Sequence, residues 1–242
     1  MSAPQVPERD PLADLVSRSL GTRVESVDAE DLAVTDGVER RRLRFATRAG
    51  ATTVLFERSP AGMTLEAQLV PFLARKSDRV PAVHSRGLPP PHASLGPWLL
   101  LEDVLAAPSA CDGDIGEIIA AKLAIERAVA KDEPALRGLG VPVDARPLPA
   151  ALASLPRGLL HGDLRCAVAR RLERGVVITA WARATIGCPV LDAAGLALAL
   201  ERDGRARDAA AVRDAYAIRA EIRDAGEAFA AAMTYLRDLG RR

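Results

Sequence analysis

Lysine is scarce in this sequence. Only Lys76, Lys122 and Lys131 occur, although 33 of the 242 residues are basic, so arginine carries nearly all of the positive charge. A fold that requires a lysine at one fixed position therefore has few candidates here. Neither charge is in excess, because 32 acidic residues leave a formal net charge of +1. This balance argues against nucleic acid or a membrane surface as a partner.

Cysteine is also rare. Cys111, Cys166 and Cys188 are widely spaced, and they form neither a CxxC pair nor a zinc-ligand pattern with histidine. We expect free thiols that pack as small hydrophobic side chains. No apolar run approaches the length of a membrane span, and the first residues lack the basic-then-apolar order of a signal peptide. These features predict a soluble, cytoplasmic protein.

The first part of the chain has the pattern of an antiparallel sheet. Hydrophobic residues make up 49% of the sequence, which is enough for a substantial core. Residues 11–20 have helical spacing, residues 32–58 are short apolar runs broken by turn signals, and residues 64–75 predict a helix. Residues 98–104 (WLLLEDV) predict a buried strand. We therefore expect an N-terminal domain over residues 1–104, a sheet with one helix beside it.

The remaining chain, residues 105–242, has mainly helical periodicity. Residues 116–130 predict an amphipathic helix, and the alanine-rich residues 191–239 predict further helices. Between them, the apolar residues 159–160 lead into an exposed turn, and a hairpin follows over residues 166–181. The predicted fold class is α+β, with the sheet first and the helices second.

The turn before the hairpin reads His161-Gly162-Asp163-Leu164. With WLLLEDV upstream and the pattern W…GxPxxDxA downstream from Trp181, this segment resembles the aminoglycoside phosphotransferase and choline kinase family. The resemblance implies a bilobal, protein-kinase-like fold in which residues 98–104 form the hinge strand. It also implies that Asp163 is the base that accepts the proton of a substrate hydroxyl. His161 would shape the loop, and Asp192 would brace it by accepting backbone hydrogen bonds.

The resemblance also implies a site for ATP or another nucleotide. Glu66 matches the helix glutamate that holds the family's phosphate-binding lysine. The end of the hinge strand, from Glu102 to Val104, would contact an adenine through its backbone. The lysine itself is missing, because Glu57 stands where the family has this cation. Unless one of them turns away or takes a proton, Glu57 and Glu66 would repel each other.

Both expected metal ligands are replaced as well. Val168 stands where the family has an amide, and Ala180 stands where it has a metal-binding aspartate. Magnesium takes oxygen ligands and bridges the phosphates, so these replacements argue against its binding. The sequence therefore predicts a degenerate phosphotransferase: a pseudokinase, inactive or weakly active, that binds a small molecule or a protein partner.

Three alternatives stay open. The chain could be an active small-molecule kinase in which Arg165 or Arg183 moves toward the phosphates and Glu57 or Glu173 toward a metal. It could bind a nucleotide without catalysis. It could also be an unrelated α+β binding protein in which HGDL occurs by chance.

Two groups of charges have both a functional and a structural interpretation. The carboxylates Asp112, Asp114 and Glu117 could receive a cationic acceptor, or they could support the start of a helix. The arginine-rich residues 39–45 could bind phosphate, although a solvated strand face is the commoner explanation.

Overall fold

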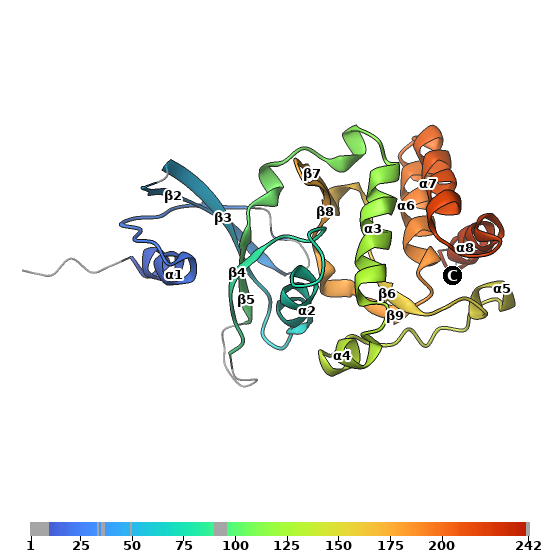
Figure 1. Ribbon diagram of the computed structural model, residues 1–242, viewed down its shortest axis with the longest axis horizontal. Coiled ribbons are helices and arrows are strands. Elements are labelled where there is room, and N and C mark those ends of the chain that lie inside the picture. The colour runs from blue at the N-terminus through green and yellow to red at the C-terminus, as the bar shows by residue number, and fades with distance from the viewer. Residues whose placement is uncertain (1–9, 33, 35–36, 49, 90–95, 241–242) are drawn as a thin grey trace, which may run out of the picture. The chain divides into compact units, whose positions relative to one another are not determined.

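The computed structural model describes residues 10–32, 34, 37–48, 50–89 and 96–240. The chain divides into two compact units (Figure 1). The first unit contains residues 1–67 and 82–103, and the second contains residues 68–81 and 104–242. The sequence predicts one boundary after residue 104, and the structure differs from this mainly in residues 68–81, which group with the second unit.

A five-stranded antiparallel sheet forms the first unit, with the strand order β1-β2-β3-β5-β4. Its strands are β1 (Asp28–Asp31), β2 (Glu39–Thr47), β3 (Gly50–Arg58), β4 (Val83–Gly87) and β5 (Trp98–Glu102). β2 and β3 pair along their whole length, as the predicted antiparallel meander requires.

Helix α1 (Pro11–Leu20) covers one face of this sheet. Asp10 caps the helix by accepting a hydrogen bond from the Leu12 N–H, and Gly21 ends it in a left-handed conformation. Val16 of α1 packs with Leu43 and Phe56 of the sheet, and all three are buried. The first unit therefore has α1 on its sheet in addition to the predicted helix α2 (Leu65–Ala74), whose first turn belongs to this unit.

The second unit is mostly helical. Its α-helices are α3 (Gly116–Val129), α4 (Glu133–Gly138), α5 (Ala150–Ala153), α6 (Val190–Arg202), α7 (Ala206–Arg219) and α8 (Ala225–Leu239). Its strand pairs are β6 (Gly158–Leu160) with β9 (Thr185–Gly187), and β7 (Ala169–Leu172) with β8 (Gly175–Ile178). Four short 3-10 segments, η1 (Val104–Ala106), η2 (Ala110–Asp112), η3 (Cys166–Val168) and η4 (Trp181–Arg183), join these elements.

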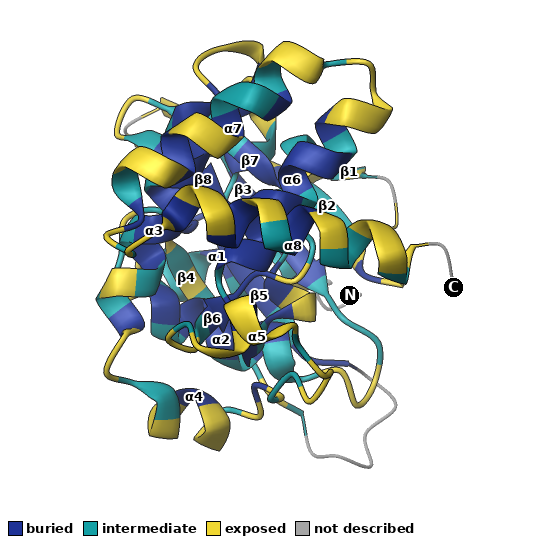
Figure 2. Ribbon diagram, turned by 90° about the vertical axis from the view of Figure 1, so that its right-hand side faces the viewer, coloured by how far each residue is buried: buried dark blue, intermediate teal, exposed yellow. Residues whose placement is uncertain are grey.

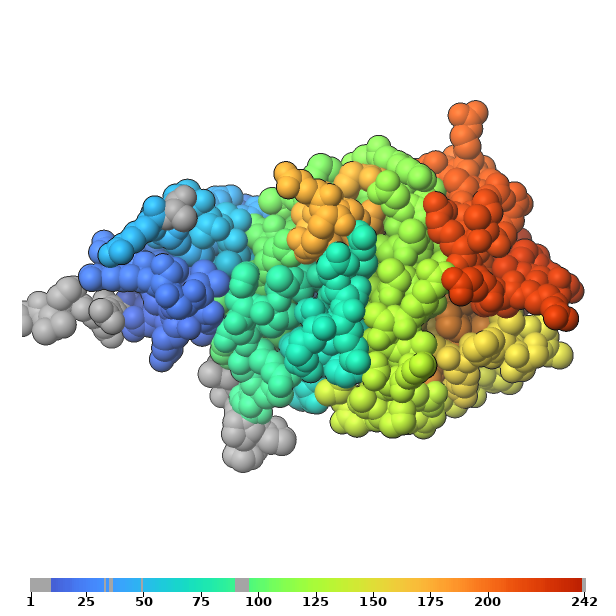
Figure 3. Space-filling view, viewed as in Figure 1, coloured from blue at the N-terminus to red at the C-terminus, as the bar shows by residue number. Residues whose placement is uncertain are grey.

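Helix α6 lies at the centre of the second unit. It packs against α7 and α8, and most of its residues are buried, as its dark blue ribbon in Figure 2 shows. α3 packs against α7 and against β8. The surface of the β7–β8 hairpin, orange in Figure 3, lies beside the green α3. The structure thus confirms the predicted α+β fold, with the sheet early in the chain and the helices late.

The expectation of free thiols is wrong for two of the three cysteines. Cys111 and Cys166 form a disulfide across 55 residues of sequence, whereas Cys188 is free and buried. The fold brings the two together because η2 and the β7–β8 hairpin are joined by backbone contacts, including a hydrogen bond of 3.0 Å from the Arg171 N–H to the Pro108 carbonyl. Within the described part of the chain, no helix is long and apolar enough to cross a membrane.

Candidate functional site

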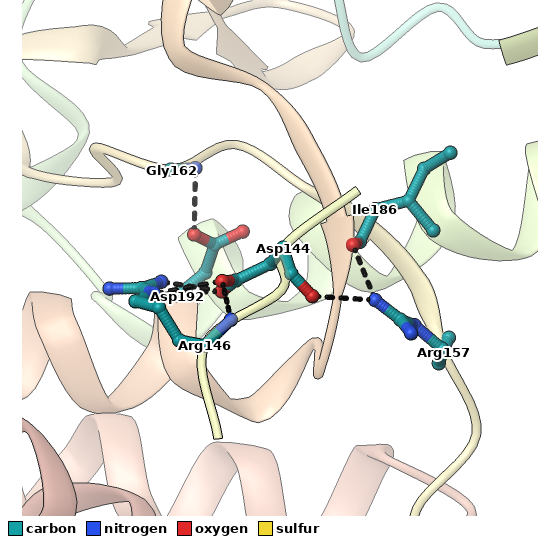
Figure 4. A network of polar contacts seen from close by, with 6 residues as sticks. All are labelled: Asp144, Arg146, Arg157, Gly162, Ile186 and Asp192. Atoms are coloured by element: carbon teal, nitrogen blue, oxygen red, sulfur yellow. Dashed lines mark hydrogen bonds and ion pairs between the residues drawn. The ribbon is translucent and has the colours of Figure 1, made fainter. Parts of the chain in front are cut away.

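The HGDL turn follows strand β6, and a side chain of α6 holds its backbone. The Asp192 carboxylate, in the first turn of α6, accepts hydrogen bonds from the backbone N–H groups of His161 (2.6 Å) and Gly162 (3.0 Å). Figure 4 shows the second of these bonds. Asp192 is almost fully buried. Its geometry is that of a carboxylate that fixes the backbone of the loop.

A buried lysine stands beside Asp192. Lys122 of α3 is 1% exposed, and its Nζ donates a hydrogen bond of 2.8 Å to the Pro189 carbonyl. The same Nζ lies 3.5 Å from Asp192 Oδ2 and forms an ion pair with Glu126. Desolvation by burial lowers the pKa of Lys122, and the charge of Asp192 opposes this change. Sequence reasoning missed this residue, although a rare lysine within an apolar helix, four residues before a glutamate, was a usable signal.

His161 uses both ring nitrogens to hold the loop. Its ring is buried, its Nε2 lies 2.7 Å from the Thr179 carbonyl, and its Nδ1 accepts a hydrogen bond from the Asp163 N–H at 3.2 Å. These partners assign the proton to Nε2. The edge of the ring meets Trp181 at a centroid distance of 4.7 Å, and desolvation lowers the pKa of His161. His161 is therefore placed to shape the loop, and protonation of Nδ1 would break the hydrogen bond that it accepts from the Asp163 N–H.

The Asp163 side chain is partly exposed and forms an ion pair with Arg165 at 3.2 Å. Both line a cavity of about 690 Å³ that lies entirely within the second unit, as does Arg146. Arg146 is itself held by Asp144 in a bidentate ion pair (Figure 4). The hydrogen bond from Arg146 is the main reason that the pKa of Asp144 is lowered. The candidate base thus opens on a cavity whose wall carries guanidinium groups.

The expected metal positions offer no oxygen side chain. Val168 is a buried residue of η3, and Ala180 has a left-handed backbone with a φ of 62°. Beside these two positions, Asp163 supplies a carboxylate, which forms a partly exposed ion pair with Arg165. In the described residues, no group of three or more His, Cys, Asp or Glu side chains could hold a metal ion. The residues present therefore do not fit magnesium held in the manner that the resemblance implies.

In the first unit, Glu57 has an arginine as its partner. It lies directly opposite Arg40 in the pairing of β2 and β3, and Arg40 Nε donates to Glu57 Oε1 at 2.6 Å. The two side chains are only 14% and 10% exposed. The charge of Glu57 is therefore matched across the sheet, and the expected repulsion from Glu66 does not govern its position. Sequence reasoning did not find Arg40, because only the strand register makes the pair.

The other arginines of β2 are paired as well. Arg41 contacts Asp31, Arg44 contacts Glu30, and Arg42 contacts Asp103 at 2.6 Å. Asp103 is 1% exposed as a side chain, and its hydrogen bond is the main reason that the pKa of Arg42 is raised. The arginine-rich strand is therefore a network of ion pairs. The expected solvated face holds for Arg44, which is 50% exposed, whereas Arg40 and Arg42 are largely buried against carboxylates.

The remaining predicted nucleotide contacts lie in both units. Glu66 is buried in the first turn of α2, and Glu102 Oε2 accepts a hydrogen bond of 3.1 Å from the Ala82 N–H. Val104 is a buried residue of η1 in the second unit. Their roles toward a nucleotide stay predictions.

The acidic group before α3 has structural partners. Asp114 Oδ1 accepts a hydrogen bond of 2.8 Å from the Gly116 N–H, and Glu117 forms an ion pair with Arg171. Both contacts stabilise the start of α3, as the structural alternative predicts.

The fold resembles that of known kinases. The amicoumacin kinase hAmiN, solved in complex with AMP-PNP, Ca2+ and Ami, matches at a TM-score of 0.56 with 11% identity, over 85% of this chain and 75% of that one. The aminoglycoside phosphotransferase APH(4)-Ia matches at 0.50 with 12% identity, over 93% and 97%. No protein-family model matches the sequence, and no curated protein matches it significantly. The chain therefore has the fold of the aminoglycoside phosphotransferases, with a sequence far from theirs.

Proposed function

We propose that this chain is a kinase-fold binding protein, a pseudokinase, in which phosphoryl transfer is absent or strongly impaired. The observation that carries the proposal is the contrast around Asp163. The loop is held by Asp192 and His161, while Val168 and Ala180 supply no metal ligand and Arg165 forms an ion pair with Asp163. Phosphoryl transfer depends on positioning and on neutralising the phosphate charge. The contacts of the loop support positioning of Asp163, whereas Val168 and Ala180 do not support neutralisation of the phosphate charge by a metal.

The test is a thermal-shift titration of the full chain with AMP-PNP, ATP and ADP, each with and without magnesium, and with Asp163→Ala as control. A ligand that binds only the folded state raises the apparent stability. We expect no shift that requires magnesium and no ADP formed from ATP above the level of the control. A magnesium-dependent shift that Asp163→Ala alters would contradict the proposal.

A gain-of-ligand variant sharpens this test. Ala180→Asp puts a carboxylate on a left-handed residue, a conformation that aspartate tolerates better than alanine. We expect this variant to acquire a magnesium-dependent shift with ATP that the native chain lacks. Ala182→Asp, an exposed position two residues later in η4, is the matched control and is expected to acquire none.

A second candidate function is an active small-molecule phosphotransferase, and the Arg40–Glu57 pair favours it. This pair keeps a buried cation next to the position at which the family has its lysine. Arg40 could then meet the phosphates, with Glu57 holding its guanidinium in place. In this candidate function, the acceptor is a small molecule with a hydroxyl group.

The double variant Arg40→Gln/Glu57→Gln separates the two candidates, because it removes both charges without leaving either one buried and unpaired. If Arg40 binds phosphate, this variant loses the shift with ATP, whereas Arg44→Gln, an exposed position on the same strand, retains it. Equal shifts in the native chain and in both variants exclude Arg40 as a phosphate ligand.

A further inference from the structure

A covalent bond ties down the loop that carries Asp163. The disulfide joins Cys111 of η2 to Cys166 of η3, and Cys166 is the third residue after Asp163. Both cysteines belong to the second unit. The bond closes a loop of 55 residues that contains α3 and β6. Opening it would release the end of the HGDL turn that Asp192 does not hold.

The two cysteines of the pair differ in exposure. Cys111 is only 3% exposed, whereas Cys166 is partly exposed and lines the same cavity as Asp163 and Arg165. A small thiol that enters this cavity therefore meets Cys166 first. Disulfides that a thiol can reach are the ones that exchange readily.

Arg205 contacts both cysteines of the disulfide. Its Nη2 donates a hydrogen bond of 2.7 Å to the Cys111 carbonyl, and its Nη1 lies 3.8 Å from Cys166 Sγ. Asp208 holds the guanidinium through a hydrogen bond of 2.7 Å to its Nε. A neighbouring guanidinium favours the thiolate form of a cysteine, which is the form that attacks a disulfide or an oxidant.

The segments stay together without the disulfide. The Arg171 N–H bonds to the Pro108 carbonyl at 3.0 Å, and Ser109 pairs with Arg170 in an isolated bridge. The segment just before Cys111 and strand β7 just after Cys166 are therefore aligned by backbone contacts that do not involve the sulfurs. Because of this alignment, two reduced thiols would remain close enough to re-form the bond.

We propose that Cys111–Cys166 is a thiol–disulfide exchange site that sets the rigidity of the Asp163 loop and thereby the shape of the adjacent cavity. A dithiol attacks Cys166 Sγ, the Cys111–Cys166 bond breaks, and Cys111 leaves as a thiolate and takes up a proton. The second thiol of the reductant attacks the mixed disulfide, so Cys166 is released beside Arg205 and the dithiol becomes a cyclic disulfide. A disulfide oxidant reverses these steps. The inference holds whether or not the chain binds a nucleotide.

The test treats the folded full chain with dithiothreitol and follows it by alkylation with iodoacetamide, mass spectrometry and hydrogen exchange. We expect Cys111 and Cys166 to be reduced and alkylated without denaturant, while Cys188 stays unmodified. On reduction, amides of residues 162–167 are expected to exchange at least about tenfold faster, with α6 residues 196–200 unchanged. The proposal is overturned by reduction only under unfolding conditions, by free thiols at Cys111 and Cys166 in chain purified without reductant, or by unchanged exchange of the loop.

Two variants test the parts played by the sulfurs and by Arg205. The double variant Cys111→Ser/Cys166→Ser is expected to show the fast loop exchange without reductant and no further response to it. Arg205→Gln is expected to slow re-oxidation of the reduced chain at pH 7 by about threefold or more, because it removes the guanidinium beside the sulfur. Arg207→Gln, exposed on α7, is the matched control and is expected to re-oxidise at the native rate. Equal rates for both arginine variants would remove Arg205 from the mechanism.

Discussion

Two sets of residues around the HGDL turn have opposite character. The supporting set, Asp192, Lys122 and His161, is buried and joined by hydrogen bonds and ion pairs. The ligand set consists of Val168 and Ala180, the two positions at which the sequence resemblance predicts metal ligands. The supporting set holds the backbone of the loop through contacts made by the chain's own side chains.

This difference teaches that the shape of the loop and its metal chemistry are separable. A metal site needs oxygen atoms from several segments. The loop needs only acceptors for its N–H groups and a glycine where the backbone is left-handed. The first unit repeats the contrast, because Glu57 lies where a cation is expected and yet is satisfied by Arg40. Substitutions around the loop test whether its shape is independent of its metal chemistry.

The largest effect is expected for Asp192→Ala. The substitution leaves two loop N–H groups without their acceptor and removes one of the two carboxylates beside the buried Lys122. Loss of one partner of a buried pair costs about 3 to 5 kcal/mol. Urea denaturation is the measurement, with Asp203→Ala, exposed at the end of the same helix, as control. Similar midpoints for the two variants would mean that Asp192 does not support the loop.

Gly162→Ala is expected to cost at least about 2 kcal/mol of unfolding free energy. Gly162 has a φ of +83°, and a Cβ there would lie 2.1 Å from the Arg183 carbonyl oxygen. The control Gly204→Ala has a similar φ of +75° with no atom within 4 Å, so it carries the conformational cost without the clash. Denaturation midpoints measure both, and a loss at Gly162 no larger than that at Gly204 would contradict the close packing of the loop.

The pH dependence of stability is expected to report His161. Desolvation lowers the pKa of this residue in the folded chain below its ordinary value of 6.5. Between the two values the unfolded chain binds the proton and the folded chain does not, so stability falls as the pH drops below about 6.5. The slope for one proton is at most about 1.4 kcal/mol per pH unit. Below the pKa of the folded chain, the stability no longer changes with pH through this residue.

Denaturation of His161→Asn between pH 7.5 and 5 checks this prediction. The variant is expected to lose most of the slope, whatever its stability at pH 7.5. His84→Asn, in β4, is the comparison: desolvation also lowers the pKa of His84, with the charge of Glu102 opposing it, so this variant is expected to lose the smaller part of the slope. A slope that survives His161→Asn would show that another group takes up the proton.

Much of the fold was accessible from the sequence, because hydrophobic periodicity reports local structure. The hinge strand, α3, the HGDL turn and the hairpin all lie where the pattern predicts them. The assignment of residues 68–81 was less accessible, since α2 is a single helix whose two ends belong to different units. Hydrophobic periodicity predicts the helix, but it does not show to which unit each end belongs.

The contacts of the site were less accessible, because they join residues that are distant in sequence. The approach of Lys122 to Asp192 and the Arg40–Glu57 pair depend on tertiary packing and on strand register. The Cys111–Cys166 disulfide likewise has no signal in its spacing. Such bonds are rare in the cytoplasm, so this one bears on the predicted localisation, which stays a prediction. Asp192 was found because the resemblance supplied its role, and the nucleotide roles of Glu102 and Val104 stay predictions.

The smallest effect is expected at Ala180, where the sequence resemblance predicts a metal-binding aspartate. Its left-handed backbone costs alanine about 1 to 2 kcal/mol, whereas glycine adopts it freely but loses more entropy on folding. Ala180→Gly is therefore expected to stabilise the chain by roughly 0.5 kcal/mol. Ala184→Gly, at a buried residue with a φ of −59°, is expected to destabilise it by at least a similar amount. Thermal denaturation of the two variants compares them directly. If Ala180→Gly destabilises the chain as Ala184→Gly does, the left-handed turn is not strained by alanine, and the separation between the shape of the loop and its lost ligand is weakened at this position.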